Sequence, residues 1–69
     1  MPIVNEVGEL AGKVWHYLDE HGRCSLTAVE AGLEAPRALV MMAIGWLARE
    51  GKVELLQEGR TTLVCLRGD

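Results

Sequence analysis

The spacing of hydrophobic residues changes near residue 52 of this 69-residue chain. Before that point, apolar residues recur at steps of three and four, which is the spacing of one face of a helix. From Lys52 to Leu66 they alternate instead about a turn at residues 57–60, which predicts a β-hairpin. Helices followed by a hairpin in so short a chain indicate one α+β domain that spans residues 1–69.

The first predicted helix runs from Asn5 to His21. Asn5 can cap its N-terminus, and Gly22 supplies a left-handed stop after its last turn. Gly8 and Gly12 lie one turn apart on this helix, where each costs about 1 kcal/mol relative to Ala. Their presence indicates a close approach of another backbone, either by packing within the monomer or by a dimer contact.

A short strand and two further helices are predicted next. Residues 23–26 are long enough only for a small strand. Thr27 and Glu30 have the spacing of a capping box, which starts a short helix that ends near residues 31–32. A third helix spans residues 36–50, because a proline suits its first position and a glycine follows its last.

The third predicted helix is apolar on nearly all sides. Its core face is predicted to consist of Val40, Ala43, Ile44 and Leu47. A monomer of 69 residues cannot easily bury a helix all round, so we expect an uncovered apolar face. Trp46 either anchors an interface there or packs beneath the first helix or the hairpin. The candidate protein-interface residues are Ala38, Met41, Met42, Gly45 and Trp46.

The hairpin is also predicted to be apolar on both faces. If Gln57 pairs with Arg60, the inner face consists of Val53, Leu55, Val64 and Leu66. The side chains that then point outwards are those of Leu56, Leu63 and Cys65.

The order of helix, short strand, helix, turn, helix and hairpin is that of a winged helix-turn-helix. Residues 8–15, residues 43–52 and the hairpin segments 53–55 and 63–64 resemble a family of small stand-alone bacterial and archaeal winged helix-turn-helix proteins of uncharacterised function. The resemblance spans essentially the whole chain. It implies three helices and a small antiparallel sheet, in which the short strand joins the hairpin, together with a nucleic-acid role.

For DNA, the resemblance implies that the third helix enters the major groove and that the hairpin tip contacts the backbone or minor groove. Arg37 and Arg60 match those two positions, and Arg49 and Lys52 are candidate outer contacts. The net charge of −3 lacks the basic excess that is typical of nucleic-acid binders.

Each of the two main candidate cations also has an acidic neighbour in the sequence, Glu34 near Arg37 and Glu58 near Arg60. The expected function is therefore a DNA-associated regulatory or accessory module that makes few phosphate contacts. The alternative is a protein-interaction or homodimerisation module without intrinsic DNA affinity.

No metal or cofactor is expected. His16, His21, Cys24 and Cys65 lack the second closely spaced ligand pair of a zinc site. The two cysteines are interpreted as free thiols, and a redox-sensitive bridge between them depends on the register of the strands.

No enzymatic activity and no small-molecule substrate are expected either. His16 and Glu20 lie one turn apart, but such pairs on a helix surface are usually solvated. The sequence has neither a nucleophile motif nor a phosphate-binding glycine loop. It also shows no secretion signal and no membrane-spanning segment, so we expect a cytoplasmic protein.

Overall fold

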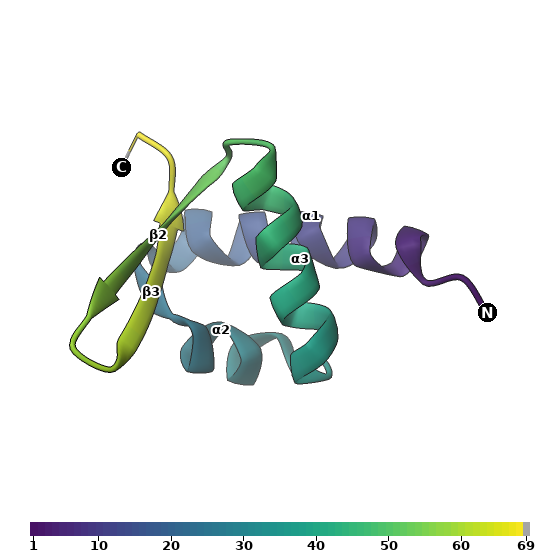
Figure 1. The fold of residues 1–69 in the computed structure, drawn as a ribbon, viewed down its shortest axis with the longest axis horizontal. Helices are drawn as coiled ribbons and strands as arrows, with labels where there is room; N and C mark the ends of the chain where they lie inside the picture. The colour runs from purple at the N-terminus through teal and green to yellow at the C-terminus, as the bar shows by residue number, and fades with distance from the viewer. Residues whose placement is uncertain (69) are drawn as a thin grey trace.

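The computed structural model describes residues 1–68, which form three helices and a three-stranded sheet (Figure 1). The strands are antiparallel and follow the order β1-β3-β2. The predicted α+β architecture is confirmed, including the short strand that joins the hairpin. In chain order the elements are α1 (Val4–His21), β1 (Cys24–Ser25), α2 (Leu26–Leu33), α3 (Arg37–Arg49), β2 (Val53–Glu58) and β3 (Thr61–Leu66).

The core lies where α1, α3 and the inner face of the sheet meet. Figure 1 shows α1 along the longest axis, with α3 crossing it and the hairpin at one end. The predicted core face of α3 is confirmed, because its four residues are at most 3% exposed. The largest fully buried side chains are those of Leu18, Val14, Val29, Val40 and Val64.

The ends of α1 agree with the prediction at one terminus only. The N-cap position is Ile3, and no side chain caps the helix there. Asn5 lies inside the first turn, so its predicted capping role is wrong. Gly22 adopts a φ of 77°, and its N–H donates to the Leu18 carbonyl at 2.8 Å. This positive φ confirms the predicted left-handed stop.

Helix α2 begins and ends at residues other than those predicted. Its N-cap is Ser25, whose Oγ accepts a hydrogen bond of 3.1 Å from the Ala28 N–H. The predicted Thr27–Glu30 capping box is therefore wrong, because the extended backbone of β1 brings the serine hydroxyl to the first turn. The helix also continues to Leu33 and ends where Glu34 adopts a left-handed φ of 53°.

Gly32 lies within α2, where Tyr17 of α1 packs against it. A Cβ atom at this position would overlap Cε2 of the tyrosine ring. That ring is held in place, since its hydroxyl donates to the Ala28 carbonyl at 3.4 Å and its face stacks on His21. The glycine therefore serves helix packing and does not end the helix.

The turn of the hairpin lies one residue later than predicted, because the last pair of the ladder is Glu58 with Thr61. Gly59, with a φ of 59°, and Arg60 form the turn, so the predicted pairing of Gln57 with Arg60 is wrong. Each residue of β2 thus pairs with a partner two residues further along β3 than expected. A shift of two residues leaves every side chain on its predicted face.

Burial on those two faces differs from the expectation at two positions. Leu55 is predicted to be internal but is 46% exposed, because β2 is an edge strand with a neighbour on one side only. Cys65 points away from the helices but is only 5% exposed, because β3 is the central strand. Leu56 and Leu63, which share this predicted outer face, are both half-buried.

The strand register places the two cysteines on opposite faces of the sheet. Cys24 pairs with Val64, so it shares the inner face, and Cys65 is the next residue along β3. Both thiols are free, and this arrangement argues against the bridge that the sequence leaves open. Partial burial raises the pKa of the Cys24 thiol, and its Sγ donates to the Gly22 carbonyl at 3.2 Å. The neutral and less nucleophilic form of this thiol is therefore favoured.

Residues 1–68 do not meet the requirements of a metal site of three side chains or of a single membrane-spanning helix. No three His, Cys, Asp or Glu side chains in this part of the chain form a group that could hold a metal ion. No single helix within it combines the length and hydrophobicity needed to cross a membrane.

The contact between Gly32 and Tyr17 predicts that Gly32→Ala destabilises the fold. The cost of displacing the tyrosine ring should exceed the gain in helix propensity. We therefore expect the free energy of unfolding, measured by urea titration, to fall by about 1 kcal/mol. Gly45→Ala in α3 is the matched control, because nothing lies within 4 Å of the position that its Cβ would take. That variant should gain up to about 1 kcal/mol. Equal stabilisation by both variants would contradict this packing.

Candidate nucleic-acid interface

A small polar hollow lies where the starts of α2 and α3 approach the tip of the hairpin. Its volume is about 180 Å³. We call it the wing cleft. Its lining brings together the two arginines that the sequence singles out and a group of hydroxyl side chains. The lining residues are Ser25, Leu26, Thr27, Arg37, Arg60, Thr61 and Thr62.

The topology of the sheet assembles this cleft from three segments. Strand β3 pairs with β1 through Ser25 and Leu63, so its first residues run beside the start of α2. Strand β3 also pairs with β2, which fixes the hairpin tip that carries Arg60. Arg37 is the first residue of α3, directly after the turn from α2. Residues far apart in the sequence therefore surround one hollow.

The start of α2 gives the cleft a positive character. The first backbone N–H groups of a helix have no acceptor within the helix, and the helix dipole adds partial positive charge there. One of these donors, the Ala28 N–H, already donates to the Ser25 hydroxyl. Thr27 and Thr61 are exposed beside it, and Thr62 Oγ1 donates to Gln57 Oε1 at 2.8 Å. This set of donors suits an anion such as a phosphate.

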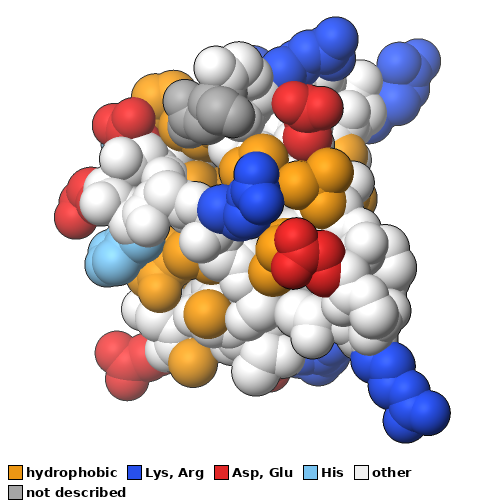
Figure 2. Space-filling model, turned by 90° about the vertical axis from the view of Figure 1, so that its left-hand side faces the viewer, with side chains coloured by type: hydrophobic (Ala, Val, Ile, Leu, Met, Phe, Trp, Pro, Cys, Tyr) orange, Lys and Arg blue, Asp and Glu red, His pale blue; other side chains and the backbone are white. Residues whose placement is uncertain are grey.

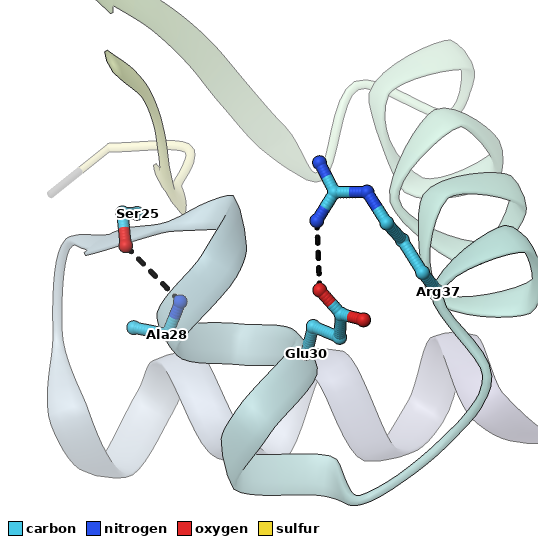
Figure 3. Close-up of polar contacts among 4 residues, drawn as sticks. All are labelled: Ser25, Ala28, Glu30 and Arg37. Atoms are coloured by element: carbon cyan, nitrogen blue, oxygen red, sulfur yellow. Dashed lines mark hydrogen bonds and ion pairs between the residues drawn. The ribbon is translucent and has the colours of Figure 1, made fainter.

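Arg37 is held by an ion pair with Glu30 of α2. Its Nη1 lies 2.7 Å from Glu30 Oε1, as Figure 3 shows beside the Ser25 cap. The acidic neighbour of Arg37 is thus Glu30 and not the predicted Glu34, which forms the left-handed end of α2. The Arg37 side chain remains 56% exposed, so part of its guanidinium is open to a ligand.

The other three candidate cations differ in position and pairing. Within residues 1–68, Arg60 forms no ion pair shorter than 4.0 Å. The acidic neighbour Glu58 therefore does not pair with it directly. Arg49 ends α3, about 18 Å along the helix from Arg37 at about 1.5 Å per residue. Lys52 Nζ lies 3.6 Å from Glu50 Oε1. The structure therefore brings Arg37 and Arg60 to the cleft and leaves Arg49 and Lys52 elsewhere.

The outward face of α3 is apolar between its two arginines. Ala38 and Gly45 are exposed, and Met42 is 48% exposed. Met41 is half-buried and packs against the core, so it is covered more than expected. Trp46 is 38% exposed and its indole contacts the Gly8 position of α1. Between residues 37 and 49, the indole N–H of Trp46 is the single side-chain N–H or O–H donor that α3 could offer to base edges.

Figure 2 shows the hairpin end of the molecule, on which basic and acidic side chains alternate around apolar patches. The positive character is therefore local to a few side chains. This agrees with a chain that has ten acidic and seven basic residues.

The hydroxyl residues of the cleft are functional candidates that sequence reasoning misses. The sequence indicates only a capping role for Thr27 and only strand positions for Thr61 and Thr62. The one signal along the chain is a pair of threonines directly after a glycine turn that carries an arginine. Their approach to α2 follows only from the register of β1 with β3.

Comparisons with known proteins agree with the winged helix-turn-helix fold. A family model described as a winged helix-turn-helix domain (DUF2582) matches residues 3–66. The uncharacterised protein MJ1608 of Methanocaldococcus jannaschii is 40% identical over 65 residues, which cover 90% of this chain and 91% of that protein. A solved structure from work on the DNA recognition and protein interaction domains of HOP2 aligns with a TM-score of 0.75. It is 26% identical, and the alignment covers 81% of this chain and 95% of that chain.

The observed cap predicts which hydroxyl at the cleft stabilises the fold. Ser25→Ala removes the acceptor of the Ala28 N–H and should lower the free energy of unfolding by about 1 kcal/mol. Thr27→Ala removes an exposed hydroxyl with no such role and should change it by less than about 0.5 kcal/mol. Thermal or urea unfolding of the two variants measures both values. A larger loss of stability in Thr27→Ala than in Ser25→Ala would contradict the Ser25 cap and support the Thr27–Glu30 capping box instead.

Proposed function

The chain belongs to the winged helix-turn-helix family DUF2582, and we propose that it is a non-enzymatic, DNA-associated regulatory or accessory module. In this proposal the wing cleft binds phosphates of the DNA backbone. The observation that carries it is the convergence of Arg37 and Arg60 on one hollow with the start of α2. The similarity to a HOP2 structure studied for DNA recognition supports the same function.

Each part of the cleft has a role in phosphate binding. The guanidinium groups of Arg37 and Arg60 supply charge-assisted hydrogen bonds from two directions. The free N–H groups at the start of α2 and the exposed threonine hydroxyls supply further donors. Arg49, at the far end of α3, and Lys52 are proposed to make outer backbone contacts.

The same geometry favours backbone binding over base reading. Discrimination between bases requires donors or acceptors on the inserted element, and the outward face of α3 presents Ala38, Met42 and Gly45. With a net charge of −3, the chain also gains little from long-range attraction to DNA. The proposed binding is therefore weakly selective for sequence and strongly dependent on salt.

The proposal predicts that Arg37→Ala with Arg60→Ala weakens binding to a mixed-sequence duplex. Fluorescence anisotropy at several salt concentrations should show an affinity for the unaltered chain that falls steeply with salt. Loss of two phosphate contacts should flatten the slope of log K against log salt by roughly 2.

Lys13→Ala is the matched control for this experiment, since it removes one exposed positive charge from α1, outside the cleft. It should leave the slope nearly unchanged. If the double variant binds like the unaltered chain, or if the control loses as much affinity, the cleft is not the binding site.

The ion pair of Arg37 predicts a variant that binds DNA more tightly. Glu30 competes with a phosphate for the same guanidinium, so Glu30→Gln should raise the affinity by a few-fold at low salt. The pair is partly exposed, and its loss should change stability by less than about 1 kcal/mol. Anisotropy and urea unfolding of this single variant test both expectations. An unchanged or reduced affinity would show that the ion pair positions Arg37 for binding.

A second function, protein interaction without DNA affinity, is favoured by the exposure of Met42 and Trp46. These side chains are 48% and 38% exposed on α3, a composition that suits an adaptable protein contact. In this alternative, Ala38, Met41 and Gly45 complete the contact surface. Complete absence of duplex binding at low salt would select this function over DNA association.

A further inference from the structure

A larger groove, separate from the wing cleft, lies between α1 and the C-terminal half of α3. Its volume is about 580 Å³. Trp15 of α1 and Trp46 of α3 line it together with the glycines of α1, and charged residues are also part of its lining. The lining residues are Gly8, Ala11, Gly12, Trp15, His16, Trp46, Leu47, Glu50 and Lys52.

The protomer does not fill this groove with its own side chains. Nothing lies within 4 Å of the position that a Cβ of Gly12 would take. At Gly8, the corresponding position is 3.7 Å from Cη2 of Trp46, which is ordinary contact. Packing within the protomer therefore requires a glycine at neither position, and Gly12 faces open space.

We propose that a second copy of this chain occupies the groove and forms a two-fold symmetric dimer. A symmetric interface requires that one face carry both a projection and a recess that receives it. Met42 lies one turn before Trp46 on α3 and is 48% exposed, so it supplies a projection, and Gly12 supplies the recess. Val4, one turn before Gly8, extends the same side of α1 and is 62% exposed.

The charges at the groove favour a second copy over a highly charged partner. Glu50 and Lys52 carry opposite charges, and Glu50 Oε1 lies 3.6 Å from Lys52 Nζ. A two-fold axis at the interface places the two Glu50–Lys52 pairs side by side in opposite directions. Glu50 of each protomer can then face Lys52 of the other. Because Glu50 offsets the charge of Lys52, the groove gives a nucleic acid little net attraction, and the outer backbone contact proposed for Lys52 is a weak one.

The face is large enough for a dimer. The molecule measures 36 Å along its longest axis and 21 Å across, and α1 runs along the longest axis (Figure 1). A stable interface needs about 800 Å² from each partner, which is comparable to a face of these dimensions. Figure 1 also places the C-terminal end of α3 opposite the end that faces α2, so a dimer formed here leaves the wing cleft open.

The test is the solution mass of the full chain without DNA, measured by light scattering and sedimentation over a range of concentrations. We expect the mass to rise from 7.6 kDa to twice that value as concentration increases. The two tryptophans of the chain both line the groove, so their emission should shift to shorter wavelength over the same range.

Gly12→Leu fills the groove and should raise the dissociation constant of the dimer by about tenfold or more, which is about 1.4 kcal/mol. The substituted Cβ meets no atom of its own protomer and leucine favours the helix, so the variant should fold. Gly12→Ala is the matched control, because one methyl group favours the helix similarly without filling the recess. Circular dichroism confirms that both remain folded.

A mass of 7.6 kDa at all concentrations overturns the proposal and assigns the groove to a different occupant. A dimer that Gly12→Leu does not weaken also overturns it. Because these measurements use no DNA, a negative result does not affect the proposed role of the wing cleft. A negative result in the DNA titration likewise does not affect the proposed dimer.

Discussion

The pairing of β3 with a strand on each side is the interaction on which the rest of this structure depends. Through β1 it ties the end of α1 to the sheet, and through β2 it fixes the hairpin. Because β1 is only two residues long, α2 begins directly beside the first residues of β3. The start of a helix, the tip of a wing and the first residue of α3 therefore meet at one point, and the wing cleft exists only because of that pairing.

The elements of the fold are predictable from the sequence because their signals are local. Hydrophobic periodicity identifies the first and third helices and the hairpin, a capping pattern indicates the second helix, and Gly22 marks the end of α1. The sequence misleads where a tertiary contact decides between local alternatives. Ser25 replaces Thr27 as the cap because β1 sets its backbone, and Gly32 belongs within α2, where Tyr17 covers it.

The candidate site is predictable only in part, for the same reason. Arg37 and Arg60 follow from the winged-helix resemblance, but their meeting at one hollow requires the register of β1 with β3. The ion pair with Glu30 also joins two helices, whereas the sequence neighbour Glu34 suggests a different partner. The groove between α1 and α3 depends on how the two helices cross, and the spacing of residues along the chain does not predict this crossing.

The start of α3 thus contributes to the main phosphate site that is proposed at the wing cleft, while its C-terminal half lines the groove that a second copy is proposed to occupy. The most direct measurement is a titration of the isotopically labelled chain with mixed-sequence duplex at low salt, followed by amide chemical shifts. We predict that the largest changes fall on residues 26–28, 37–38 and 59–62. Changes centred instead on residues 8–16 and 46–52, or no changes at all, would contradict the assignment of phosphate to the wing cleft.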